Sequence, residues 1–98
     1  MIAVFTAEAE ADLACIGDFI ARDNPRRAVG FVTEPIERCL QLAEFPEGFP
    51  LVPLHAESGV RRRSYGSHLI FDRVRSERIE SLHVMNGVRD WESLLFPD

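Results

Sequence analysis

The last third of the chain, from Gly59 to Trp91, alternates short β-prone runs with residues that favour tight turns. Three such runs follow one another, separated by Gly66-Ser67 and by Ser76-Glu77. Runs of branched and aromatic residues joined by short connections are typical of adjacent antiparallel strands. This part of the sequence therefore predicts a three-stranded antiparallel meander, on which the preceding segments must pack.

The residues before the meander predict one short strand and two helices. Residues 2–5 are an apolar run, and Thr6 is a good N-cap for a helix over residues 7–22. Asn24-Pro25 ends that helix and starts a second one, which runs to about Phe45-Pro46. Two short helices joined by so tight a turn predict an αα-hairpin.

Each predicted helix carries an apolar stripe at helical spacing. The stripe of the first helix contains Ala9, Leu13, Ile16 and Ile20, and that of the second contains Ala28, Val32, Ile36, Cys39, Leu42 and Ala43. Pro35 interrupts the second stripe and predicts a kink, because proline removes a helical hydrogen bond. The 98 residues allow one domain over 1–98. The predicted fold class is α+β, with an N-terminal strand, a helical hairpin and then the meander in one small twisted sheet.

The middle run of the meander is apolar on both faces. Leu69 and Phe71 point to one side, and Ile70 and Val74 to the other, which is typical of a strand covered on both sides. The helical hairpin covers one face. The other face is covered either by the C-terminal segment from Trp91 or by another protein.

Composition and charge limit the possible binding partners and the cellular compartment. The net charge is −5, yet residues 60–98 carry seven arginines against six acids, so the meander is mildly basic and the helices are acidic. An acidic protein is unsuited to strong non-specific binding of nucleic acid, so the basic meander better fits an acidic peptide. No apolar run approaches the roughly 20 residues needed to cross a bilayer. The start of the chain lacks the features of a signal peptide, so we expect a cytoplasmic protein.

Cysteine and histidine offer little chemistry. In a hairpin turning near Asn24, Cys15 and Cys39 are offset by about 7 Å along the helix axis, so we expect two buried free thiols rather than a disulfide. The histidines lack partners at metal-ligand spacing, and no metal or cofactor is expected. A triad of Ser67, His83 and Asp90 can be drawn, but no nucleophile-turn motif supports it.

Several short motifs, in this order and spacing, give the chain a resemblance to a known family. They are Leu42-Ala43-Glu44-Phe45-Pro46-Glu47-Gly48, Gly59-Val60-Arg61, Gly66, Ile70-Phe71 and Gly87-Val88-Arg89-Asp90. Together with the element order, they resemble the ParE branch of the RelE/ParE toxins of bacterial toxin–antitoxin pairs. Asp72 stands where this family often has an aromatic residue, and Asn86 where many members have a histidine.

The resemblance implies a toxin of a type II toxin–antitoxin system. ParE-like toxins poison DNA gyrase and are neutralised by a ParD-type antitoxin, which implies a binding protein rather than a catalyst. The expected antitoxin contacts are apolar hairpin residues and meander arginines: Leu13, Ile20, Val32, Arg61, Arg63 and Arg73. Arg61, carried over from the family motif, is expected to pair with Asp90. The expected target contacts are Arg89, Trp91 and Leu95, because arginine and large hydrophobic side chains often anchor interfaces.

Two alternatives remain open. RelE-like relatives cleave messenger RNA on the ribosome with basic and tyrosine side chains. An RNase here would have to rely on residues such as Arg61, His68, His83 and Tyr65, since the chain has neither lysine nor a tyrosine in its tail. The third possibility is a non-toxic relative that retains only antitoxin binding.

Overall fold

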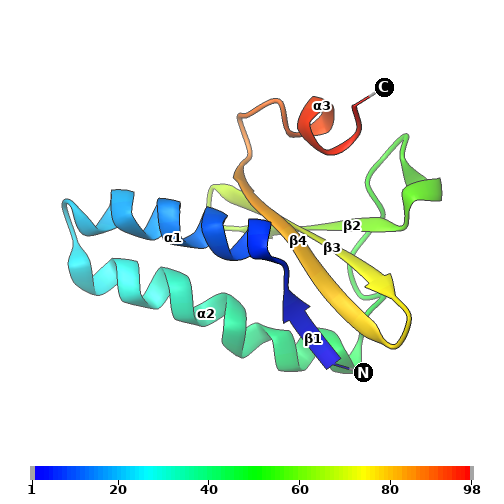
Figure 1. The fold of residues 1–98 in the computed structure, drawn as a ribbon, viewed down its shortest axis with the longest axis horizontal. Coiled ribbons are helices and arrows are strands. Elements are labelled where there is room, and N and C mark those ends of the chain that lie inside the picture. Colours follow the sequence, from blue (N-terminus) through cyan, green and yellow to red (C-terminus); the bar gives the residue numbers. More distant parts are fainter. Residues whose placement is uncertain (1, 98) are drawn as a thin grey trace.

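The computed structural model describes residues 2–97, apart from the side chains at positions 36, 39–41 and 43. A helical hairpin lies against one face of a four-stranded sheet, and a short C-terminal helix lies over the other side (Figure 1). The elements are β1 (Ile2–Phe5), α1 (Ala7–Ala21), α2 (Pro25–Glu44), the 3-10 turn η1 (Ala56–Ser58), β2 (Val60–Tyr65), β3 (His68–Arg75), β4 (Arg78–Asn86) and α3 (Trp91–Leu95). The predicted α+β class and element order are confirmed.

Local sequence signals fix the ends of both long helices. The Thr6 side chain accepts from the Ala9 amide at 3.1 Å and caps α1. The Thr6 hydroxyl also donates to the carbonyl of Leu82 at 3.0 Å, which ties the start of α1 to β4. The Asn24 side chain accepts from the Arg27 amide at 3.1 Å, and α2 begins at Pro25 as predicted. Pro35 lies inside α2, which continues through it as one helix.

The strand order is β1-β4-β3-β2. The meander strands pair antiparallel with two-residue turns, as predicted, and β1 adds a parallel strand beside β4. Gly66 sits in the first turn at a φ of 60°, a backbone region that glycine enters without strain. Parallel pairing of the first and last strands leaves β2 at one edge of the sheet.

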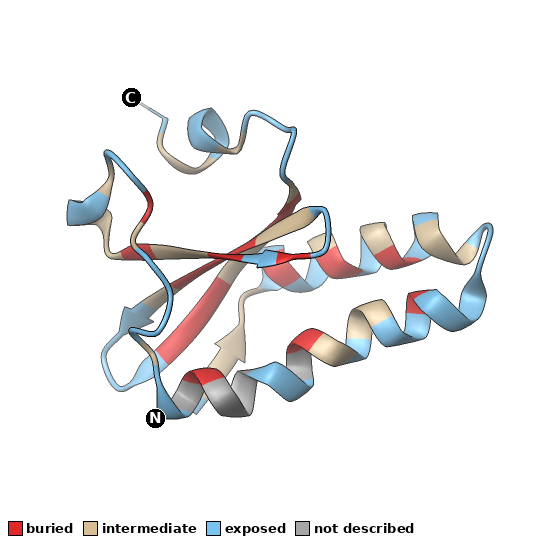
Figure 2. Ribbon diagram, turned by 180° about the vertical axis from the view of Figure 1, so that it is seen from behind, coloured by how far each residue is buried: buried red, intermediate tan, exposed pale blue. Residues whose placement is uncertain are grey.

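The sheet separates two apolar clusters. The first faces the hairpin and contains Leu13, Tyr65, Ile70 and Val84, with Phe5, Ile16 and Phe31 packed against it. The second, on the opposite face, contains Val52, Val60, Phe71 and Met85, with Trp91, Leu95 and Phe96 against it. The C-terminal segment therefore covers the second face, which was one of the two possibilities that the sequence left open. Buried residues concentrate in the strands, while the helices present exposed outer surfaces (Figure 2).

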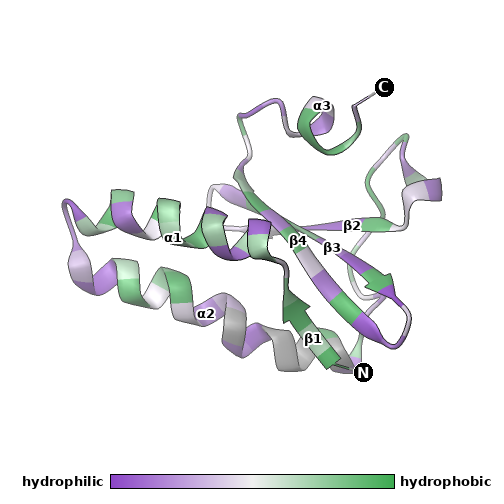
Figure 3. Cartoon of the chain, in the orientation of Figure 1, coloured by the Kyte–Doolittle hydropathy of each residue, from purple (hydrophilic) through white to green (hydrophobic). Residues whose placement is uncertain are grey.

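The thiol prediction is wrong for Cys15, which is exposed. Residues 9, 13 and 17 of α1 face the core, and Cys15 lies two residues, or about 200° around the helix, from Leu13. The side chain of Cys39 lies outside the described residues. The hydropathy of α1 alternates between apolar and polar positions, as expected for a helix with one buried and one exposed face, whereas β1 is apolar along its length (Figure 3).

Candidate partner-binding site

Three consecutive arginines of the edge strand β2 divide between the two faces of the sheet. The strand alternation predicted this division, and the contacts confirm it. Arg63 reaches Asp72 on the hairpin side, whereas the guanidinium of Arg62 lies 5.3 Å from the centre of the Trp91 ring on the other side. The edge strand therefore presents cations to both layers of the protein.

Arg63 and Asp72 form a buried ion pair. The Arg63 Nε donates to Asp72 Oδ2 at 2.9 Å, and both side chains are under 5% exposed. The other carboxylate oxygen of Asp72 accepts from the Ser81 hydroxyl at 2.7 Å, so the network crosses three strands. Within the described residues, Nη2 of Arg63 is buried without a hydrogen-bond partner. A buried pair of this kind is costly to break from one side, because the remaining charge is left uncompensated.

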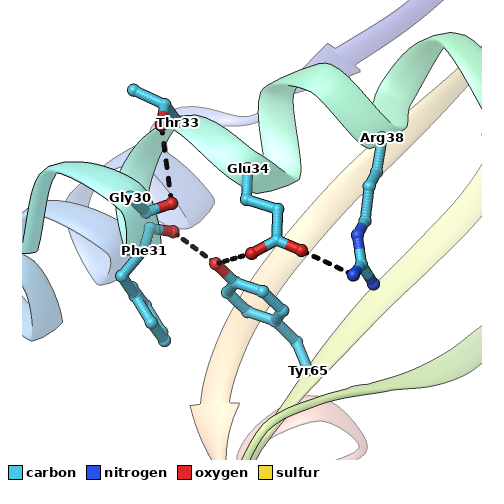
Figure 4. Close-up of polar contacts among 6 residues, drawn as sticks. All are labelled: Gly30, Phe31, Thr33, Glu34, Arg38 and Tyr65. Atoms are coloured by element: carbon cyan, nitrogen blue, oxygen red, sulfur yellow. Dashed lines mark hydrogen bonds and ion pairs between the residues drawn. The ribbon is translucent and has the colours of Figure 1, made fainter. Parts of the chain in front are cut away.

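Tyr65 repairs the hydrogen-bonding defect that Pro35 makes in α2. Proline has no N–H, so the carbonyl four residues earlier, that of Phe31, lacks its helical donor. The Tyr65 hydroxyl donates to this carbonyl at 2.8 Å (Figure 4). The hydroxyl is also 3.5 Å from the Glu34 carboxylate, which pairs with Arg38 one turn further on. Burial, together with the charge of Glu34, raises the pKa of Tyr65 above its usual value of 10.0.

Arg61 holds the loop that follows α2. Its Nη1 donates to the carbonyl of Phe49 at 2.7 Å and lies 3.5 Å from that of Glu47. The expected pair with Asp90 does not form: Asp90 instead caps α3 by accepting from the Ser93 amide. Asp90 lies beyond β4, where a helix start supplies amides that need an acceptor.

The same loop covers only part of the outer edge of β2. The Arg62 amide donates to Pro50 O at 3.0 Å, and the Val52 amide donates to Val60 O at 2.9 Å. Backbone groups that point outward recur at every second residue of a strand, so Ser64 also points outward. Ser64 lies beyond the covering segment and is exposed. The end of β2 is therefore a short open edge.

A pocket of about 310 Å³ lies between the C-terminal half of α2 and this open edge. Its lining combines cationic, apolar and small residues: Arg38, Leu42, Phe45, Phe49, Arg63 and Ser64. The side chains of Phe45 and Phe49 are exposed. A concave site with an apolar lining and a few polar groups is the usual form of a binding pocket.

The residues expected to bind an antitoxin are not equally accessible. Leu13 is buried in the first core cluster, so its assignment to a partner surface is corrected. The apolar spacing of α1 marks the core face and cannot distinguish core from interface. Ile20 and Val32 are half-buried on the hairpin, and Val32 touches the α1 backbone near Gly17. Arg73 is half-buried on β3, and its Nε lacks a partner among the described residues.

The residues expected to contact a target also differ in how accessible they are. Arg89 is exposed in the connection between β4 and α3, next to Val88, which is 93% exposed. Trp91 and Leu95 are half-buried and pack on the second core cluster. Their contact with a target stays a prediction, and their observed role is to hold the tail on the sheet.

The histidines have structural partners. His83 lies 3.0 Å from the carboxylate of Asp12, which also accepts from the Val84 amide and so fastens α1 to β4. His68 has a lowered pKa because burial disfavours its charged form, and its ring lies edge-on to Phe31. Among the described residues, no three potential ligands gather into a metal site. The drawn triad does not assemble, since His83 pairs with Asp12 and Asp90 caps α3.

The pocket residues Arg38, Phe49 and Ser64 were not among the sites predicted from the sequence. Their only sequence signal is the density of aromatic residues near the end of α2, opposite the arginine run. Bringing the two segments together requires the packing of α2 beside β2.

The fold defines a class of small α+β domains with a helical hairpin on a sheet that ends in an arginine-rich edge. Residues 3–91 match the family model of the ParE toxin of type II toxin–antitoxin systems, parDE, and the chain belongs to this family. A solved structure described as the chromosomal ParDE toxin–antitoxin system from P. aeruginosa is similar. It is 25% identical, the match covers 88% of this chain and 95% of that chain, and the TM-score is 0.72. No match was found among curated proteins.

In the part of the chain that the structure describes, none of the helices is long and apolar enough to cross a membrane.

Proposed function

We propose that this ParE-family toxin inhibits DNA gyrase in the cytoplasm and is neutralised by a ParD-like antitoxin. The observation that carries the proposal is the family match over residues 3–91, together with the similarity in fold to a ParDE system. A toxin of a two-component system requires a surface for its partner and a surface for its target. Two separate regions of the chain fit these roles.

The first region is the outer surface of the hairpin and the adjoining edge of β2. Phe19 and Val29 are 68% and 64% exposed on the two helices, which is unusual for large apolar side chains on a small surface. Amphipathic helices commonly bind to such apolar surfaces, and arginines beside them select acidic partners. Of the expected antitoxin contacts, Ile20, Val32 and Arg61 belong to this region, and Arg63 lines the pocket at its edge.

The second region is the connection between β4 and α3. Val88 and Arg89 are exposed there, between a strand fixed in the sheet and a helix fixed by its Asp90 cap. A short connection held at both ends presents its side chains with little loss of conformational entropy on binding. We therefore assign target contact to Arg89 first, with Trp91 and Leu95 supporting the segment from beneath.

The RelE-like ribonuclease has weaker support. Tyr65 donates its hydroxyl to Phe31, and Arg61 is bonded to loop carbonyls. His83 is paired with Asp12 of α1. General acid–base catalysis requires groups within reach of a substrate proton, and these groups already have partners in the fold.

Two measurements test the proposal. Co-expression with the neighbouring reading frame should yield a stable complex, and the purified free chain should inhibit gyrase supercoiling. Arg89→Ala should weaken that inhibition, whereas Arg75→Ala, an exposed arginine at the far end of β3, should not. Antitoxin binding without gyrase inhibition would instead identify a non-toxic relative. Specific cleavage of ribosome-bound message, lost in His83→Ala, would establish the ribonuclease.

A further inference from the structure

The pocket between α2 and β2 contains a cationic group with unused hydrogen-bonding capacity. The guanidinium of Arg63 uses Nε to bind Asp72, while Nη2 is buried and has no partner among the described residues. Arginine offers five donors in a fixed planar fork, so one carboxylate does not satisfy it. A buried charged donor that gains an acceptor recovers the cost of its lost hydration, which makes this group a strong local site for an anion.

The pocket rim carries a second arginine that can be recruited. Arg38 pairs with Glu34 on the same helix, and both side chains are about half exposed, at 48% and 45%. Exposed pairs of this kind contribute little and exchange readily with solvent. An incoming carboxylate can therefore share Arg38 with Glu34, or replace Glu34, at small cost. Arg61, beside the pocket, adds a positive charge, and its Nη1 donates to backbone carbonyls.

The remaining features of the pocket favour a peptide ligand over a small free anion. Phe45 and Phe49 are 71% and 42% exposed at its rim and would be covered by apolar side chains. The outward-facing backbone groups of Ser64 lie at the same place, where the loop no longer covers the edge of β2. Open strand edges bind extended peptides through main-chain hydrogen bonds. A volume of about 310 Å³ accommodates one or two side chains rather than a large ligand.

We propose that this pocket receives one acidic side chain of the antitoxin, carried on an extended segment with apolar neighbours. The carboxylate binds between Nη2 of Arg63 and the guanidinium of Arg38, and the segment's backbone passes Ser64. The inference rests on the proposed antitoxin partnership and names the chemistry that the partner must bring. Arg63 is thus a specificity residue as well as the partner of Asp72, because its Nη2 has no acceptor among the described residues and a carboxylate is the strongest acceptor for a guanidinium.

The probe is a pair of short peptides, acetyl-Leu-Glu-Leu-amide and its Gln counterpart, titrated into the full-length protein and followed by ¹⁵N NMR. The Glu peptide should shift the amides of Gly48, Phe49 and Ser64 and the Nε–H signal of Arg63. It should bind roughly tenfold more tightly than the Gln peptide, the effect expected for one charge-assisted hydrogen bond. Equal binding of the two peptides, or shifts confined to other surfaces, would overturn the proposal.

Variants separate the pocket from the fold. Arg38→Gln should weaken the preference for the Glu peptide, whereas Arg75→Gln, the same change at the exposed far end of β3, should leave it intact. Arg63→Leu alone strands a buried carboxylate and can unfold the chain, so the informative variant is Arg63→Met with Asp72→Asn. This neutral pair should retain the circular dichroism spectrum and show a weaker preference for the Glu peptide, of which Arg38 supplies the remainder. An undiminished preference in the neutral pair would contradict the assignment of Arg63.

The co-expressed complex distinguishes failure of this inference from failure of the proposed function. Arg38→Gln should weaken antitoxin binding roughly tenfold relative to Arg75→Gln. If both variants bind the antitoxin as tightly as the parent chain, the pocket assignment is wrong while the partnership stands. If the neighbouring gene product does not bind the parent chain at all, the proposed function itself fails, and this inference with it.

Discussion

Replacing Tyr65 by Phe removes a single oxygen atom whose function depends on Pro35. The hydroxyl donates to the Phe31 carbonyl, which has no helical donor because residue 35 is a proline. In a Pro35→Ala background, the new amide at position 35 can donate to the same carbonyl along the helix. The contribution of the Tyr65 hydroxyl to stability should therefore be large beside Pro35 and small beside Ala at that position.

The magnitude follows from burial. Tyr65 is 8% exposed, and its ring centroid lies 4.8 Å from that of Phe31, a contact that Phe at position 65 can also make. Leaving a largely buried carbonyl without a donor costs about 1–3 kcal/mol. We expect Tyr65→Phe to lower the free energy of unfolding by about 1.5 kcal/mol in the parent chain, and by about 0.5 kcal/mol in the Pro35→Ala background. The coupling between the two positions is then about 1 kcal/mol.

The four chains of this double-mutant cycle can be compared by urea unfolding, followed by far-ultraviolet circular dichroism. The dependence of the unfolding free energy on urea should be the same in all four, since none changes the buried surface substantially. Glu34→Gln serves as the control, because it alters the weaker 3.5 Å contact of the same hydroxyl and should change stability by less than about 0.5 kcal/mol. An equal cost of Tyr65→Phe in both backgrounds would refute the link between the proline and the tyrosine.

Three further outcomes are expected. Gly17→Ala should destabilise by roughly 1–3 kcal/mol in thermal unfolding, because its Cβ would lie 2.9 Å from Cγ2 of Val32. Gly30→Ala, which meets nothing within 4 Å, should instead stabilise by about 0.5–1 kcal/mol; the opposite ranking would contradict the packing. Burial lowers the pKa of His68 below 6.5, so the unfolded chain takes up its proton first and stability falls as pH drops below about 6.5. His68→Gln should flatten that fall in urea midpoints measured between about pH 7 and 5, and an unchanged slope would count against burial as the cause. Truncation after Asp90 removes α3 from the second core face and should lower the melting temperature by at least roughly 8 °C; unaltered melting would show that α3 contributes nothing to that core.

Local signals in the sequence predicted most of the fold. Thr6 and Asn24 cap helices through contacts within three residues, and Gly66 turns a hairpin whose strands are adjacent in the chain. Such features depend on neighbouring residues alone, so they can be predicted from the local sequence. The parallel pairing of β1 with β4 has no comparable signal, because its partners are joined only by the packing of the whole chain.

The candidate site was less predictable for the same reason. Arg63 was predicted as an antitoxin contact and Asp72 only as a departure from the family pattern; their buried pairing was not predicted, because it depends on the elements that cover them. Tyr65 appeared as a potential acid or base, and its bond to Phe31 becomes visible only when α2 lies beside β2. Leu13 is apolar, which suits burial either in the core or in an interface with a partner. Periodicity identifies the buried face of a helix but not the molecule that buries it.

The position of β1 in the sheet has a consequence for the order in which the fold can form during synthesis. Ile2 pairs with Arg78, and the Thr6 hydroxyl is bonded to a residue 76 positions later. At about 5–20 residues per second, a ribosome adds that stretch in roughly 4–15 s. The helical hairpin can form early in this interval, but β1 has no strand beside it until β4 has left the ribosome. The nascent chain therefore cannot complete its sheet until β4 has been translated, and any binding surface that depends on the complete sheet is absent up to that point.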